Sequence, residues 1–264
     1  MIDWTAPVVL KGEIREFPEY CATVRAEHQA CLEWLGSGEV RWHVPGGLSA
    51  KVVEDGSLRP FHGDTVVLPL EEPGLTPMAR LQRSLREELG DHLARPLDPG
   101  QFHVTVHDLA GGPDREALEE RLVVQAKEVR LRFDRIATAL DRAPARSRVF
   151  LESTGLFPSC NISMVLGLQP ATDQDFRALM AIYNLLDEIV PLAWWPRLHV
   201  TLDYFRPVPL DAGQVGRLAR VIARLAPPRI DLQLDLKKLA YQTFTDMNSY
   251  ITLFTVAAGS PGSP

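Results

Sequence analysis

The pattern of apolar and polar residues along the chain occurs twice in the same order. Apolar runs with a period near 3.6 residues predict helices, and alternating or continuous apolar runs predict strands. The first occurrence predicts elements at 65–70, 77–93, 102–109, 111–127, 129–133 and 149–152. The second predicts elements at 161–168, 173–189, 198–205, 211–225, 230–234, 239–245 and 250–257. Each occurrence begins as strand, helix, strand, helix and continues with further strands.

The spacing within the two occurrences indicates an internal duplication. His103 follows Thr65 by 38 residues, and His199 follows Asn161 by the same 38 residues. Two units of one design predict two pseudo-equivalent lobes. If the lobes pair about an approximate twofold axis, equivalent strands of the two units face each other across one cleft.

The duplication also predicts how the chain is divided. The expected segments are an N-terminal extension of loops and one helix at about 18–35 (residues 1–60), a first lobe (61–153), a second lobe (154–257) that begins with a hinge at 154–160, and a disordered tail rich in Gly, Ser and Pro (258–264).

Two strand-like stretches, one in each unit, carry a histidine and a threonine two residues apart. They read Phe-His-Val-Thr-Val at 102–106 and Leu-His-Val-Thr-Leu at 198–202. Residues i and i+2 of a strand share a face, so His103 and Thr105 face one side together, as do His199 and Thr201. We therefore expect these four side chains to line the predicted cleft.

Two histidines and two threonines form a set of residues suited to phosphoryl chemistry. A neutral imidazole takes up a proton near neutral pH while a charged one donates a proton, which is what in-line displacement at phosphorus requires. Threonine hydroxyls can hold the non-bridging oxygens. A single His-x-Thr is ordinary in a strand, but its recurrence at matching places favours function. A zinc site formed by His103, His107 and His199 is the metal alternative, although the sequence shows no carboxylate or cysteine to complete it.

Composition limits the class of protein. The net charge of −6 argues against an extended nucleic-acid-binding surface. Three widely spread cysteines without metal spacing are typical of reduced thiols in the cytoplasm. The N-terminus lacks the pattern of a signal peptide, and no apolar run reaches the roughly 20 residues of a membrane span. We expect a cytoplasmic monomer with no membrane partner.

The paired motifs His103-Val104-Thr105-Val106 and His199-Val200-Thr201-Leu202 resemble the duplicated H-x-T-hydrophobic signature of the 2H phosphoesterase superfamily. That superfamily includes the 2′-5′ RNA ligase-like proteins and cyclic nucleotide phosphodiesterases. The run at 60–65 and Gly46-Gly47 also look like a bacterial branch of 2H phosphodiesterase-like proteins.

This resemblance implies an α+β fold of two antiparallel-sheet lobes with outer helices, which face each other across a central cleft. It also implies metal-independent and cofactor-free cleavage of a 2′,3′-cyclic phosphate or 2′-5′ phosphodiester in a nucleotide or RNA end. One histidine would deprotonate the attacking water and the other would protonate the leaving ribose oxygen, with the two assignments left open. Thr105 and Thr201 would hold the phosphate.

Further residues are candidates for substrate contact, and two other functions stay open. His107 is expected on the face of His103, and Arg197 precedes the second motif. Aromatic candidates for stacking on a base are Trp42, Phe61, Tyr204 and Tyr250. The alternatives to a hydrolase are RNA end-joining through the same site and a binding module that holds a nucleotide or RNA end without turnover.

Overall fold

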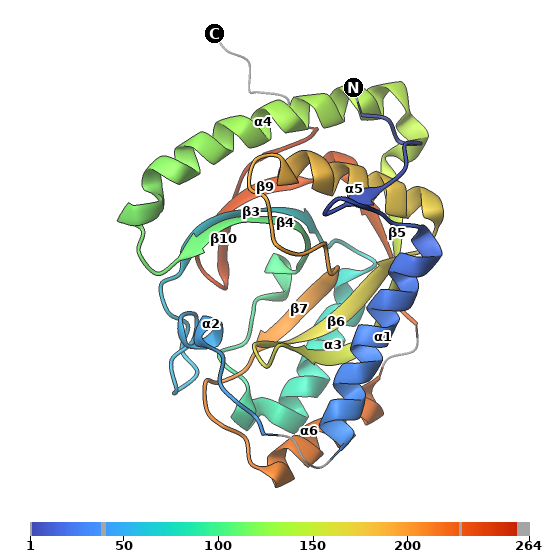
Figure 1. Cartoon of the computed structure of the whole chain (residues 1–264). Helices are drawn as coiled ribbons and strands as arrows, with labels where there is room; N and C mark the ends of the chain where they lie inside the picture. The colour runs from blue at the N-terminus through green and yellow to red at the C-terminus, as the bar shows by residue number, and fades with distance from the viewer. Residues whose placement is uncertain (1, 38–40, 227–228, 258–264) are drawn as a thin grey trace.

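An eight-stranded antiparallel sheet organises the computed structural model, which describes residues 2–37, 41–226 and 229–257 (Figure 1). In order across the sheet, the strands are β10 (Ser249–Thr255), β9 (Ala240–Asp246), β3 (His62–Pro69), β4 (His103–Gly112), β7 (His199–Tyr204), β6 (Ser163–Pro170), β5 (Arg148–Ser159) and β8 (Asp231–Asp235). Two short strands, β1 (Val9–Leu10) and β2 (Glu13–Ile14), form a separate two-stranded sheet.

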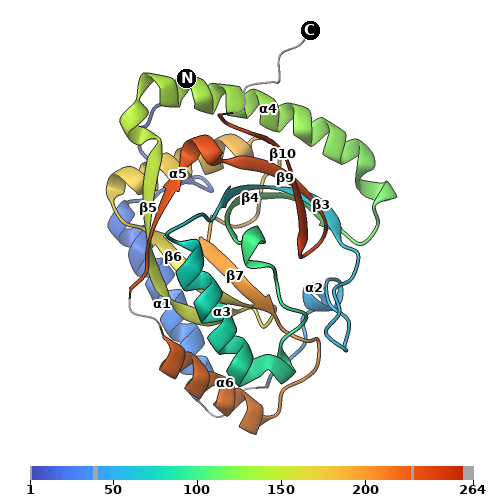
Figure 2. The same ribbon diagram turned by 180° about the vertical axis from the view of Figure 1, so that it is seen from behind.

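The large sheet has two halves that join at the two motif strands. β4 and β7 are paired through Val104 and Val200, with three strands outside β4 and three outside β7. Seen from opposite sides, Figures 1 and 2 show the sheet curled rather than flat, with helices on its outer side. The expected α+β class is confirmed, and the motif strands lie at the centre of the sheet.

Six α-helices surround the sheet in the described part of the chain. They are α1 (Phe17–Gly36), α2 (Gly46–Ser49), α3 (Leu75–Leu89), α4 (Glu119–Arg142), α5 (Asp173–Asp187) and α6 (Ala212–Leu225). Short 3-10 helices lie at Gly90–His92, Pro99–Gln101, Glu116–Leu118, Pro144–Arg146 and Leu236–Lys238. Helix α3 packs against β7 and α5 packs against β4, so each motif strand is backed by a helix on its outer side.

Apolar spacing explains why these helices pack as they do. Met78, Leu81, Leu85 and Leu89 recur along one side of α3 and are all buried, as the sequence pattern predicts. Helix α6 begins at a capping box in which the Asp211 carboxylate accepts from the Gln214 backbone N–H. The predicted helices at 18–35, 77–93, 173–189 and 211–225 are confirmed, with ends that differ by a few residues.

The strand predicted at 129–133 is wrong, and the helix predicted at 111–127 begins later than expected. Residues 119–133 belong to one helix, α4, which runs from Glu119 to Arg142, whereas 111–112 end β4. Val129, Phe133 and Ile136 are buried, whereas Leu131 is 54% exposed. The buried positions follow a helical spacing that continues to Leu140, and the local alternation was coincidental.

The hinge predicted at 154–160 is also wrong. Residues 154–159 form the end of β5, which pairs with β6 through to the contact between Ser159 and Ser163. The chain reverses there with Cys160 and Asn161 in the left-handed region. The tail predicted at 258–264 lies outside the described residues. No helix within the described residues has the length and apolar character needed to cross a bilayer.

Candidate functional site

A cleft of about 250 Å³ lies beside the junction of β4 and β7. His103 and Thr105 line it from β4, and His199 and Thr201 line it from β7. Because β4 and β7 are antiparallel neighbours, the two motifs approach each other from opposite strand directions. The structure thus brings together the four residues of the paired motif in one cavity.

Both motif histidines are oriented by the same backbone contact. The Nδ1 atom of His103 lies 2.7 Å from the carbonyl oxygen of Gln101, and that of His199 lies 2.7 Å from the carbonyl oxygen of Arg197. A carbonyl only accepts, so Nδ1 carries a proton in each ring and donates it. In each neutral ring Nε2 is therefore the unprotonated nitrogen, which can take up a proton from a ligand in the cleft.

Burial and nearby charges set the proton affinity of this pair. Burial lowers the pKa of both His103 and His199 from the ordinary histidine value, because the low-dielectric surroundings disfavour the charged ring. A charge on His199 lowers the pKa of His103 further. The Asp108 carboxylate, which also lines the cleft, raises the pKa of both rings. Mutual repulsion disfavours the doubly charged pair.

A β-bulge follows the threonine in both motif strands. On β4, His107 pairs with Val66 but Thr105 pairs with the adjacent Val67, so one residue of β4 is extra. The same shift occurs between β7 and β6, where Thr201 and Asp203 pair with adjacent residues. Each bulge reverses the alternation of faces. The residues that follow, Asp108 on β4 and Tyr204 on β7, consequently line the cleft.

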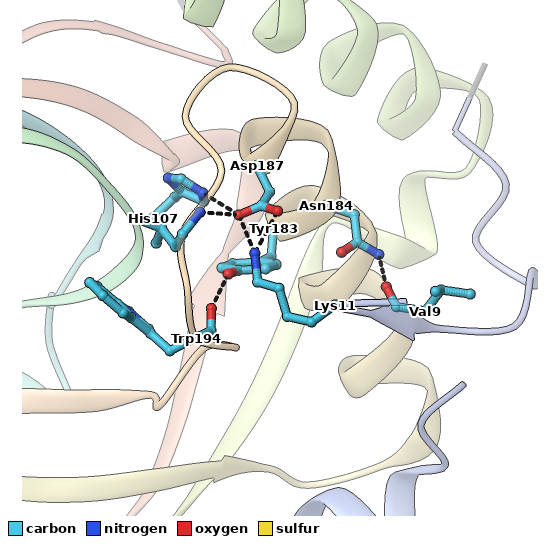
Figure 3. A network of polar contacts seen from close by, with 8 residues as sticks. Val9, Lys11, His107, Tyr183, Asn184, Asp187 and Trp194 are labelled. Atoms are coloured by element: carbon cyan, nitrogen blue, oxygen red, sulfur yellow. Dashed lines mark hydrogen bonds and ion pairs between the residues drawn. The ribbon is translucent and has the colours of Figure 1, made fainter. Parts of the chain in front are cut away.

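The bulge explains why the placement expected for His107 is wrong. His107 does not share the face of His103 but is buried on the opposite side, with Nε2 3.4 Å from the Asp187 carboxylate of α5. Figure 3 shows this contact together with Lys11, whose Nζ lies 2.6 and 2.7 Å from the two Asp187 oxygens. The Tyr183 ring lies beside His107, at 5.1 Å between centroids. The N-terminal extension is thereby connected to the outer side of β4.

The zinc alternative needs His107 to converge with the motif histidines, and the bulge turns it away. In the described residues, no group of three or more His, Cys, Asp or Glu side chains could hold a metal ion.

Asp203 occupies the corresponding position on β7 and is also turned away from the cleft. Its carboxylate is fully buried, lies 3.0 Å from Nη1 of Arg86 on α3, and accepts from the Leu97 backbone N–H at 3.2 Å. Burial raises the pKa of Asp203 to about 6, against the opposing effect of the Arg86 charge. The amide of Gln82 donates to the carbonyl of Leu202 at 2.9 Å, which braces the bulge. Behind each bulge, a fully buried polar side chain therefore pairs with a partly exposed one of opposite charge type.

Of the aromatic candidates, Tyr204 and Tyr250 line the cleft. The Tyr250 ring meets the His103 ring edge-on at 5.0 Å between centroids. The Tyr204 hydroxyl lies 3.2 Å from the sulfur of Met247, which also lines the cleft.

Three other candidates do not line the cleft. Arg197 is held outside it by the Glu27 carboxylate at 2.5 and 2.6 Å and by the Trp195 ring, 3.3 Å below the guanidinium. Trp42 is a core residue whose ring meets Phe205 edge-on. The Phe61 ring lies parallel to the ring of Phe244, which does line the cavity.

Several lining residues carried no signal in the sequence. Lys51, Asp108 and Phe244 belong to no repeated motif, and each comes from a different part of the chain. The β5–β6 turn, interpreted from sequence as a hinge, contributes Ser159 and Cys160. The position of Asp108 could have been inferred only with knowledge of the bulge.

The fold is shared with solved structures of other proteins. A conserved protein of unknown function, ATU0111 from Agrobacterium tumefaciens str. C58, aligns with a TM-score of 0.56 at 20% identity over 81% of this chain and 94% of its own. TT0787 of Thermus thermophilus aligns with a TM-score of 0.42 at 15% identity, over 75% and 99% of the two chains.

E. coli LigT aligns with a TM-score of 0.38 at 12% identity, over 74% of this chain and 95% of its own. A structure described as a phosphoesterase aligns with a TM-score of 0.39 at 14% identity, over 74% of this chain and 96% of its own. No protein-family model and no curated protein matches the chain. At 20% identity, the likeness to ATU0111 describes the fold alone.

Proposed function

We propose that the protein is a phosphodiesterase that hydrolyses 2′,3′-cyclic phosphates or 2′-5′ phosphodiester bonds of nucleotides or RNA ends, with two histidines as general acid and base. The observation that carries the proposal is the matched pair of imidazoles in one cleft, each with Nδ1 bound to a carbonyl two residues earlier. Such a pair offers one Nε2 atom to accept a proton and another to donate one.

In the proposed reaction, a water molecule attacks phosphorus as the neutral histidine takes its proton. The bond from phosphorus to a ribose oxygen breaks on the opposite side, and the charged histidine gives its Nε2 proton to that oxygen. The histidine pair gains one proton and loses one, so at the end the positive charge lies on the ring that was neutral at the start. Thr105 and Thr201 donate their hydroxyl protons to the non-bridging oxygens.

The lowered pKa values of the two rings place the required mixed state below the ordinary histidine pKa of 6.5. Burial favours the neutral form of each ring, and a charge on His199 lowers the pKa of His103, which separates the uptake of the first proton from that of the second. The singly protonated pair is therefore populated over a range of pH. The two rings have equivalent orientations, so either can act as the base.

The test is turnover of the four nucleoside 2′,3′-cyclic phosphates by EDTA-treated protein. His103→Ala and His199→Ala should each lower kcat by about 10²- to 10⁴-fold, the usual contribution of a general acid or base. His92→Ala is the matched control, because this histidine lies in the 3-10 helix Gly90–His92 and does not line the cleft. Circular dichroism checks that each variant is folded.

Two results would reject the proposal. Either histidine variant could retain a kcat near that of the wild type, in which case the imidazoles are not the acid and base. Alternatively, tight binding of a cyclic nucleotide without any product would identify a binding module.

A further inference from the structure

The side chain of Lys51 reaches the cleft from the N-terminal extension. It follows α2 and places its ammonium group 5.1 Å from the centroid of the Phe61 ring and 5.6 Å from that of Tyr204. Phe61 directly precedes β3 in the first half of the sheet, whereas Tyr204 ends β7 in the second half. The ammonium group is thus held between residues of both halves.

The fold fixes the backbone from which this side chain extends. Leu48 and Val52, on either side of Lys51, are fully buried and anchor the segment in the core. The carbonyl of Lys51 accepts from the Arg59 N–H at 2.8 Å, and Val52 forms a β-bridge with Leu58. The position of the lysine is consequently built into a hairpin-like turn.

Lys51 brings a positive charge to the lining of the cleft. Among the described residues that line the cleft, Lys51 is the only lysine or arginine, and Asp98 and Asp108 supply the opposite sign. Lys51 forms no ion pair within the described parts of the chain. A positive charge held over aromatic rings without a carboxylate partner is available to an anionic ligand.

Aromatic side chains separate this ammonium group from the histidine pair. The Phe61 ring lies parallel to Phe244 at 6.2 Å, Phe244 lies 5.4 Å from Tyr250, and Tyr250 lies 5.0 Å from His103. Two rings of the cleft wall therefore stand between the ring under Lys51 and the first motif histidine. Ring faces of this kind suit a nucleobase or ribose.

We propose that Lys51 forms a second anion subsite, which binds a phosphate group of the substrate other than the one that reacts. The inference rests on the proposed function, since it takes the reacting phosphate to lie between His103 and His199. The hydroxyls and the charged imidazole already serve that phosphate. The substrate class is then a nucleotide or oligonucleotide end with at least two phosphate groups, one on each side of a nucleoside.

Binding of two product-like ligands tests the subsite without relying on turnover. Calorimetry compares adenosine 3′-monophosphate with adenosine 3′,5′-bisphosphate at low salt. One charge-assisted phosphate contact should make the wild type bind the bisphosphate about 10- to 100-fold more tightly. Lys51→Met keeps the aliphatic stem and should abolish this gain, while Lys51→Arg should retain most of it. Lys127→Met, on the exposed side of α4, should leave the gain unchanged.

The possible outcomes separate the two proposals. An equal loss of affinity for both ligands in Lys51→Met would place the lysine at the reacting phosphate and overturn the second subsite. Absence of any gain from the 5′-phosphate in the wild type would also overturn it. A gain that depends on Lys51, in a protein that does not turn over cyclic phosphates, would support the subsite and reject the proposed hydrolase.

Discussion

Removing Arg86 should destabilise the protein strongly at pH 8 and hardly at all at pH 5. Arg86 is the cationic partner of Asp203, whose carboxylate is fully buried behind the β7 bulge. Arg86→Met removes the charge and keeps most of the aliphatic stem. An ionised carboxylate left without its partner in the interior is costly, whereas a protonated carboxyl group needs no cation.

The pKa of Asp203 sets the size of this effect. In the folded wild type that pKa is about 6, above the ordinary value of 3.8, so ionisation of the group already reduces stability as the pH rises through 6. Without Arg86 the folded pKa rises further. At pH 8 the carboxyl group of the variant can avoid the unpaired charge by binding a proton. Protonating a group with a pKa of about 6 at pH 8 costs about 3 kcal/mol of free energy. This value is the upper limit of the loss at pH 8.

Urea unfolding followed by circular dichroism at the two pH values measures the loss. Arg83→Met is the matched control, because Arg83 lies on the same helix and is exposed. In an Asp203→Asn background, Arg86→Met should have no dependence on pH, because the group that titrates is gone. A loss of equal size at pH 5 and pH 8 would refute the reasoning and indicate that Arg86 acts by packing alone.

Three further predictions concern the cleft and the sheet. The maximum of kcat/KM should lie below pH 6.5, because burial lowers the pKa of both motif histidines. The histidine that acts as the acid loses its proton as the pH rises above its pKa. A maximum above pH 7 in a pH–rate profile would contradict this. Asp108→Asn removes a carboxylate that raises both pKa values and should move both limbs of that profile to lower pH. An unmoved profile would mean that Asp108 does not influence the rings. Gly167→Ala places a methyl group on the His28 ring and should lower the free energy of unfolding by about 1–3 kcal/mol, as overpacking does. Gly36→Ala, with open space around it, is the control in the same chemical denaturation, and equal effects of the two would be contrary to expectation.

The sequence was most informative where the candidate site residues themselves follow the spacing of a strand or helix. The His-x-Thr pairs at 103–105 and 199–201 place both side chains on one strand face, and their equal spacing in the two units relates the strands to each other. Both strands lie side by side in the structure. Leu81, Leu85 and Leu89 of α3 were equally easy to interpret, because a four-residue spacing that is repeated has few alternatives.

The errors arose where a short window was compatible with two periods. Val129, Arg130 and Leu131 alternate as a strand does, but buried positions continue at helical intervals through Ile136 and Leu140. A longer window would have favoured the helix. The placement of His107 failed for another reason, since one extra residue in β4 reverses the face and no turn or glycine marks it.

Lys51 lay beyond the reach of pattern analysis altogether. Its place in the cleft depends on how the segment after α2 packs against Phe61 and against Tyr204, which lies 153 residues later in the sequence. The position of a single lysine in the tertiary structure produces no periodic pattern in the sequence.

The order of strands in the sheet has a consequence for how the protein is made. β3 forms early in the chain, yet its neighbour on the outer side is β9, more than 170 residues later, and β10 completes that half. A nascent chain that ends before β9 leaves the edge of β3 without a partner, so Tyr250 and Phe244 are absent from the cleft. Such long-range pairing slows folding and exposes an edge that invites association with other chains. The cleft is therefore completed only when the last strands of this sheet, β9 and β10, have left the ribosome. Shortened chains that retain both histidines should still lack a finished site.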